Sequence, residues 1–225
     1  MPTTIDVPIV QRRQIDDMTE VTCQLNGKEF PHKAGQHIQV TLPSLFFQDK
    51  KGNMRTFNIL SSPNNDQYIS FAFVNSDSAF KKTINQLPLK SQIQIKGAFG
   101  MFTLPSGDKD LVFISQGIGV VPCMSIILYA TEENLKNKIK IIHCGKNKIP
   151  YEEDLKELEN VNSSLSVITK NGEIDSAFLK KNISKTENTI FYVSGFSQHV
   201  QKTKQALLQM NVQISNIKTE EFAGY

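Results

Sequence analysis

The chain has few of the residues that build metal centres and disulfide frameworks. Its three cysteines, Cys23, Cys123 and Cys144, lie far apart and form no C-x-x-C motif. This removes the usual sequence support for an iron–sulfur cluster or a zinc site, and an odd, sparse count indicates a reducing compartment. The histidines show no metal-ligand spacing either, so we expect surface or strand residues and no bound metal. They are His32, His37, His143 and His199.

Long apolar runs and strong charge are also missing. No apolar segment approaches the length of a membrane span, and the N-terminal sequence lacks the basic and apolar regions of a signal peptide. The net charge of +3 is too small to indicate a nucleic-acid partner, and no Lys/Arg-rich run is interleaved with aromatics. We therefore expect a soluble, cytoplasmic protein with no membrane span.

The composition is that of a folded globular protein. Of 225 residues, 39% are hydrophobic and 21% are charged, which is the globular regime. Such a chain can bury a core without disulfides, as one large domain or two small ones. No Ser/His/Asp or Cys/His arrangement for nucleophilic catalysis emerges.

The first half of the chain predicts a small antiparallel β-barrel. Short β-branched segments alternate with turn residues, and Asn26-Gly27 predicts a hairpin turn between the first two. Residues 78–87 break the pattern with helical spacing, and Ser78 or Ser76 is the candidate N-cap. The expected strands cover residues 21–25, 37–42, 55–60, 68–74 and 91–95.

The second half predicts an α/β domain with a parallel sheet. Short, β-branched runs at 111–114, 139–142, 165–168 and 189–193 alternate with helical patterns. A polar turn cluster, Pro105-Ser106-Gly107-Asp108, is suited to a domain joint, so we expect domains at 1–104 and 109–225. The expected helices lie near 122–131, 151–159, 175–181 and 198–209.

The segment Arg55-Thr56-Phe57-Asn58 carries the first functional signal. Because strand side chains alternate between faces, Arg55 and Phe57 share one face. An arginine fork matches a phosphate and an aromatic ring stacks on a flat heterocycle, so the pair suits a ligand with both groups. An ordinary half-buried strand is the alternative reading of these four residues.

Glycine-containing loops follow the ends of neighbouring strands in the second half. Ser115 to Pro122 contains two glycines before an apolar helix, and Ser194-Gly195-Phe196 follows the last predicted strand. Glycine permits close approach of a ligand to the backbone, and a helix N-terminus can hold an anion. We expect both loops to face one cleft, although a purely structural glycine turn fits the first equally well. Lys146 and Lys148 could reach a phosphate or remain solvated.

The order of these motifs resembles the ferredoxin–NADP reductase superfamily of flavoproteins over nearly the whole chain. Arg55-Thr56-Phe57-Asn58 is similar to the family's R-x-[YF]-[ST]. The segment from Gly97 to Phe102 resembles G-P-x-G-x-F, and that from Gln116 to Pro122 resembles G-G-I-G-[IV]-T-P. Ser194-Gly195-Phe196 stands in the place of C-G-P. The ending Glu221 to Tyr225 is similar to the short aromatic tails of some bacterial members.

The resemblance implies a role for each matched position. Arg55 would grip the FAD pyrophosphate, Phe57 would stack on the flavin, and Asn58 would face flavin N5. Asn58 and the terminal Tyr225, which would cover the second flavin face, are the candidate catalytic residues. The candidate FAD-binding residues are Arg55, Thr56, Phe57, Asn58, Phe73, Ser78, Ala79, Phe80 and Tyr225. The candidate NAD(P)-binding residues are Gly117, Ile118, Gly119, Val121, Pro122, Ser194, Gly195 and Phe196.

The chain departs from the family pattern at four positions. Asn58 replaces a Ser or Thr, which changes the hydrogen bond to flavin N5. Gln116 replaces a glycine, Val121 a threonine and Phe196 a proline. These three lie on the pyridine-nucleotide side, so the flavin half of the match is the firmer one.

The resemblance implies an FAD-dependent NAD(P)H oxidoreductase with an FAD-binding barrel followed by a pyridine-nucleotide-binding domain. It would pass electrons to a separate acceptor, such as a ferredoxin, a flavodoxin, an oxygenase component or free flavin. One alternative is an NAD(P)H:flavin reductase that uses flavin as a substrate. Another is a non-catalytic FAD-bearing electron-transfer subunit. The choice of NADH or NADPH and the oligomeric state stay open, and a monomer is compatible with the sequence.

Overall fold

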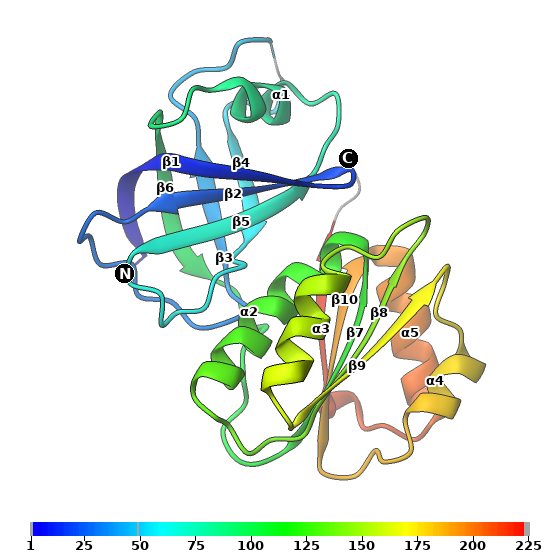
Figure 1. Ribbon diagram of the computed structural model, residues 1–225. Coiled ribbons are helices and arrows are strands. Elements are labelled where there is room, and N and C mark those ends of the chain that lie inside the picture. The colour runs from blue at the N-terminus through cyan, green and yellow to red at the C-terminus, as the bar shows by residue number, and fades with distance from the viewer. Residues whose placement is uncertain (1, 49, 223–225) are drawn as a thin grey trace. The chain divides into compact units, whose positions relative to one another are not determined.

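The structure is a computed structural model that describes residues 2–48 and 50–222 (Figure 1). The chain divides into two compact units, Met1–Thr103 and Leu104–Tyr225. Buried clusters of apolar side chains form a separate core in each. Within the described ranges, no helix has both the length and the apolar character needed to cross a membrane.

The first unit is an antiparallel β-barrel. Its sheet has the order β4-β3-β6-β1-β2-β5, and an antiparallel bridge between Ile59 and Phe71 joins its two ends. Leu60 N–H also donates to the Ser70 carbonyl at 2.8 Å, which extends this closure. The strands are β1 (Thr3–Ile15), β2 (Met18–Gln24), β3 (His37–Thr41), β4 (Met54–Asn58), β5 (Tyr68–Val74) and β6 (Gln92–Phe99), and the helix is α1 (Ala79–Gln86).

The turn predicted at Asn26-Gly27 is present, but the two strands on either side of it do not pair as a hairpin. Both residues have positive φ angles of 52° and 75°, and Lys28 N–H donates to the Leu25 carbonyl at 3.0 Å, so the turn exists. However, β2 pairs with β1 and β5, whereas β3 pairs with β4 and β6. The chain runs without a strand between β2 and β3, so a local turn signal does not decide which strands pair. The long strand β1 was not predicted.

The barrel core follows from the alternation that the sequence shows. In β6 the burial alternates from Gln92 to Gly97, and Ile93 and Ile95 are buried. Helix α1 adds Phe80 and Ile84 to the same apolar cluster. A half-polar strand and an amphipathic helix thus bury their apolar sides together.

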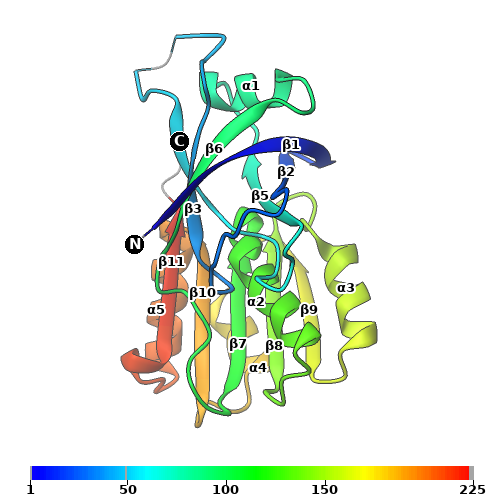
Figure 2. The ribbon, with the colours of Figure 1, turned by 90° about the vertical axis from the view of Figure 1, so that its left-hand side faces the viewer.

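The second unit is a parallel sheet with helices on both faces. The sheet order is β11-β10-β7-β8-β9. Helices α2 and α3 cover one face and α4 and α5 the other (Figures 1 and 2). The strands are β7 (Asp110–Gln116), β8 (Ile139–Gly145), β9 (Leu165–Asn171), β10 (Thr189–Phe196) and β11 (Ile217–Phe222). The helices are η1 (Gly117–Gly119), α2 (Val120–Glu132), α3 (Glu152–Val161), α4 (Ser176–Asn182), α5 (Ser197–Gln209) and η2 (Ile214–Asn216).

This architecture confirms the predicted fold class of an antiparallel barrel followed by an α/β unit. The central strands β7 and β10 are buried along nearly their whole length, as continuous β-branched runs predict. The edge strand β11 was missed because its sequence, IKTEEF, has no apolar run. Pairing with β10, rather than local pattern, makes this segment a strand.

Candidate functional site

Arg55 lies on β4 between the preceding loop and helix α1. Its side chain is buried, and its Nη1 donates to the carbonyls of Lys51 at 3.1 Å, Gly52 at 2.9 Å and Met54 at 2.7 Å. The guanidinium carbon lies 5.3 Å from the centre of the Phe80 ring. The cation is therefore held in one place against the first turn of α1.

A second cation, Lys81, lies near enough to Arg55 for their charges to interact. The pKa of Lys81 is lowered from its ordinary value, first by burial and then by the positive charge of Arg55. Two cations whose charges act on each other raise the local positive potential, which favours binding of a negative group. The first turn of α1 contains no acidic residue. The sequence did not predict Lys81 as a candidate ligand. The one signal for it was its place on a helical segment next to a predicted phosphate site.

Ser78 stands at the N-cap position of α1 but does not cap the helix. Its backbone has φ −54° and ψ 129°, and its side chain accepts no bond from the helix. Within the described residues, Ser78 Oγ is buried and has no hydrogen-bond partner, while Ser76 Oγ accepts from the Ser78 N–H at 3.4 Å. An orphaned hydroxyl beside two cations and a helix N-terminus fits a phosphate oxygen. Ala79 is buried just behind it.

Phe57 shares a face with Arg55, as predicted, because both lie against the Phe80 ring. Its own ring packs on Phe71 with centroids 5.1 Å apart and on Phe73 at 5.6 Å. With 9% of its surface exposed, Phe57 is part of the barrel core. Stacking of Phe57 on a flavin therefore stays a prediction, and Phe73 is placed beside Phe57 rather than at the surface.

Asn58 is buried at the end of β4 and is the register partner of His37 on β3. Thr56, one position earlier, is exposed. A Cβ at Gly100, which has φ +97°, would lie 2.9 Å from His37 Nδ1, and one at Gly97 would lie 3.0 Å from Ile38 Cγ2. Contact with β3 thus leaves little room for a side chain at Gly97, and the positive φ and the His37 ring together disfavour one at Gly100.

The two glycine loops of the second unit contact each other. Strands β7 and β10 are adjacent. A Cβ on Gly119 would lie 2.4 Å from the Ser194 carbonyl oxygen, and Ser194 Oγ donates to the Gly119 carbonyl at 2.6 Å. The main chains at these strand ends are therefore as close as a glycine allows, and the Ser194 hydroxyl is buried between them.

The predicted residues of these loops fall into two groups. Gly117 has φ +54°, and a Cβ there would meet no atom within 4 Å, while Phe196 is 41% exposed. These two positions are open to a ligand. Gly195 has φ +147° and supports the turn into α5, where a Cβ would lie 3.2 Å from His199 Cδ2. The others are buried: Ile118, Gly119, Val121, Pro122 and Ser194.

His199 corrects one sequence prediction, because it lies neither at the surface nor on a strand. It is buried in the first turn of α5, and its Nε2 has no hydrogen-bond partner among the described residues. Burial lowers its pKa to about 4. His143 is on a strand, as expected, and fully buried; its Nε2 lies 3.0 Å from the Pro150 carbonyl, and burial lowers its pKa to about 4.

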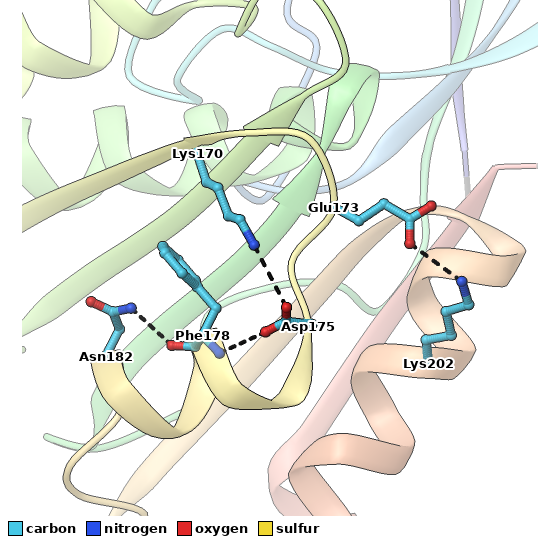
Figure 3. Close-up of polar contacts among 6 residues, drawn as sticks. All are labelled: Lys170, Glu173, Asp175, Phe178, Asn182 and Lys202. Atoms are coloured by element: carbon cyan, nitrogen blue, oxygen red, sulfur yellow. Dashed lines mark hydrogen bonds and ion pairs between the residues drawn. The ribbon is translucent and has the colours of Figure 1, made fainter.

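The turn from β9 into α4 binds its own cation (Figure 3). Asp175 Oδ1 accepts from the Phe178 N–H at 2.7 Å and caps α4. Lys170 Nζ lies 3.9 Å from Asp175 Oδ2 and 4.6 Å from the centre of the Phe178 ring. This strand-end lysine was not among the predicted residues, and its contacts here are internal.

The chemistry of the cysteines is that of buried core residues. All three are free thiols, and burial raises the pKa of Cys23 and Cys123 to about 12 and that of Cys144 to about 11. Cys123 Sγ lies 3.2 Å from Ser194 Oγ, inside the contact between the glycine loops. No group of three or more metal-ligating side chains occurs among residues 2–48 and 50–222. The predicted Tyr225 lies outside the described residues.

Comparison with known protein sequences finds relatives among the flavohemoproteins. No protein-family model matches the chain. It is 27% identical over 194 residues to a flavohemoprotein of Bacillus subtilis, covering 76% of this chain and 46% of that protein. It is 25% identical over 209 residues to a flavohemoprotein of Oceanobacillus iheyensis, covering 84% and 50%. The chain thus spans about half the length of these relatives.

Solved structures match the fold along nearly the whole chain. The flavohemoprotein-like FAD/NAD-binding domain of a Vibrio cholerae nitric oxide dioxygenase aligns with a TM-score of 0.85 at 16% identity, covering 97% of this chain and 98% of that one. A ferredoxin–NADP+ reductase from Plasmodium falciparum aligns with a TM-score of 0.79 at 16% identity, covering 98% and 97%. The fold is therefore that of a two-domain FAD/NAD-binding reductase module. The chain has the ferredoxin–NADP reductase fold, which is the fold that the sequence resemblance predicted.

Proposed function

We propose that this chain is an FAD-dependent NAD(P)H oxidoreductase that passes electrons to a separate acceptor. The observation that carries the proposal is the cation pair of Arg55 and Lys81 beside the N-terminus of α1, in a barrel of the ferredoxin–NADP reductase fold. Two cations beside a helix N-terminus create a positive potential that favours a dinucleotide pyrophosphate. When bound, the flavin would take a hydride from NAD(P)H and release electrons onward.

The first unit would hold FAD. Arg55 and Lys81 supply charge for the phosphates, and the orphaned Ser78 Oγ supplies a hydrogen-bond donor. Asn58 would stand at the reactive flavin nitrogen, where its amide can donate as well as accept. Phe57 and Phe73 would support the site from the aromatic core. We accordingly assign residues 1–104 as the FAD-binding domain.

The second unit would hold the pyridine nucleotide, over residues 109–225. Gly117, with its open positive-φ turn, lets a ligand approach the backbone before α2. Phe196 offers an exposed ring at the end of β10. Gly119 and Ser194 would act indirectly by locking the two loops together. Tyr225 is proposed to cover the flavin, and its deletion should change the affinity for nicotinamide.

The acceptor is proposed to be a separate redox centre. Ferredoxin, flavodoxin and oxygenase components remain the candidate classes. The flavohemoprotein relatives, named for flavin and haem, add a haem protein to the acceptors that should be tested. A reducing compartment such as the cytoplasm stays the proposed location, from the cysteine content.

Anaerobic mixing tests the assignment. Purified protein loaded with FAD should lose its flavin absorbance when NADH or NADPH is added. Bleaching by neither coenzyme would favour the non-catalytic FAD-bearing subunit, to which the altered loop residues Gln116, Val121 and Phe196 give some support. Retained yellow colour after extensive dialysis would distinguish a bound cofactor from the flavin substrate of an NAD(P)H:flavin reductase.

A further inference from the structure

The connection between β3 and β4 carries exposed aromatic rings that the proposed phosphate site does not use. We call residues 43–48 and 50–53 the β3–β4 loop. Phe46 is 49% and Phe47 46% exposed. Among the phenylalanine and tyrosine residues in the described part of the barrel unit, these two are exposed by more than a third, whereas Tyr68 and Phe99 are half-buried. Two neighbouring phenyl rings left in water are costly unless a partner covers them.

The β3–β4 loop is anchored at both of its ends. Leu45 packs against the barrel core, and the Phe46 N–H donates to Oγ1 of the buried Thr83 at 3.0 Å. Further along, the carbonyls of Lys51 and Gly52 accept from Arg55. The loop therefore runs from the cation of the proposed phosphate site to the middle of α1, and both ribbon views show it beside that helix (Figures 1 and 2).

The length of α1 between its N-terminus and Thr83 suits one end of a dinucleotide. Thr83 is four residues beyond Ala79, which is about 6 Å along a helix that rises about 1.5 Å per residue. A purine is separated from its nearest phosphate by a single ribose. A ligand whose phosphates meet Arg55 and Lys81 can therefore bring its purine to the part of the loop that Thr83 holds.

We propose that Phe46 and Phe47 form an aromatic platform on which the adenine ring of FAD stacks. The proposal rests on the proposed function, since it takes FAD as the ligand of the barrel unit. Stacking would cover the exposed rings and would make the unit select FAD over FMN, which has a phosphate and the same flavin but no adenine.

The test compares the two flavins in matched variants. Dissociation constants for FAD and FMN are measured by flavin fluorescence for the wild type, for F46L/F47L, for F46Y/F47Y and for M54A. Leucine keeps apolar bulk while removing the ring, and tyrosine keeps the ring. Met54, the first residue of β4 and next to the loop, is a comparably exposed apolar residue and serves as the control.

We expect F46L/F47L to weaken FAD binding by between about 5- and 150-fold, the range for loss of one stacked base. FMN binding should change by less than about 2-fold, which is below the smallest stacking loss. F46Y/F47Y and M54A should bind both flavins as the wild type does.

Three other outcomes would contradict the proposal that adenine stacks on Phe46 and Phe47. An equal loss for FAD and FMN in F46L/F47L would show that the rings only support the loop. Unchanged FAD affinity would show that they contact something else, such as a protein partner. A wild type that binds neither flavin would refute the proposed function itself, and the platform with it, whereas the first two outcomes leave that function standing.

Discussion

The candidate sites of the two units consist of different kinds of chemical group. In the barrel unit the site consists of side-chain charge and a hydroxyl: Arg55, Lys81 and Ser78 surround the start of α1. In the α/β unit it consists of main chain, because Gly119 and Ser194 bring two strand ends into contact. We call the first a charge-built site: removal of a charge should weaken ligand binding and leave the fold of the unit intact. We call the second a backbone-built site: addition of a side-chain group should disturb ligand binding and also lower the free energy of unfolding of the unit.

The largest expected effect is on the acid stability of the α/β unit. His143 and His199 are buried there as neutral imidazoles, with pKa values lowered from 6.5 to about 4. Between these values the unfolded chain binds more protons than the folded one, so the free energy of unfolding falls as the pH decreases. Full loss amounts to about 3 kcal/mol for each histidine once the pH is below 4.

Urea unfolding of this unit between pH 7.5 and 4 measures that loss. His199→Gln should remove about half of the pH dependence, because the side chain then no longer titrates. His143 is left unchanged in this comparison, since its ring makes hydrogen bonds that a substitution would break. Equal pH dependence in the variant and the wild type would contradict the assignment.

Arg55→Ala tests the charge-built site. Loss of a charge-assisted phosphate contact should weaken FAD binding by about 1.5–3 kcal/mol, which corresponds to roughly 10- to 150-fold. Equilibrium dialysis with FAD provides the measurement. The control is Lys202→Ala, which removes an exposed cation of the other unit that pairs with Glu173 (Figure 3). Flavin content as in the wild type would refute the phosphate site.

Gly119→Ala tests the backbone-built site. The added methyl group would lie 2.4 Å from the Ser194 carbonyl oxygen, so the loops must separate, at a cost of about 1–3 kcal/mol in the free energy of unfolding. Gly117→Ala is the matched control, because its methyl group meets no atom and only its positive φ is strained. The denaturant midpoint should fall further for Gly119→Ala than for Gly117→Ala, and a midpoint of Gly119→Ala at or above that of Gly117→Ala would contradict a role for the contact between the loops.

The smallest effect is expected from Ser194→Ala. This change removes the hydroxyl that donates to the Gly119 carbonyl at 2.6 Å while leaving the volume nearly unchanged. The free energy of unfolding should fall by about 0.5–1.5 kcal/mol. Ser76→Ala, at an exposed position in the barrel unit, should have a smaller effect. A larger loss at Ser76 than at Ser194 would reverse the comparison between the units.

The sequence predicted most elements because their patterns are local. The alternation of Gln92 to Ile95 and the apolar runs of β7 and β10 reappear in the burial of those strands. Edge strand β11 and the pairing partners of β2 and β3 were not predicted. They depend on contacts between segments distant in the chain, which a local pattern does not record.

The candidate sites divide in the same way. Arg55 and the loops at Gly117 and Gly195 were predicted as candidates because residue type and spacing carry the signal. Lys81 was missed because a lysine on a helix is ordinary until the fold brings it to another cation. Phe57, predicted to stack on a ligand, is buried among other rings, since the alternation of a strand tells which side chains share a face but not what covers that face.

By itself, the sequence determined the two-part architecture and predicted Arg55 as a candidate phosphate ligand, because periodicity and short motifs are properties of neighbouring residues. Only the tertiary structure decided that Lys81 lies beside Arg55, that Gly119 must be a glycine because of Ser194, and that Phe46 is held on α1 through Thr83. Each of these is a contact between side chains or backbone atoms of different elements, and packing alone sets such distances.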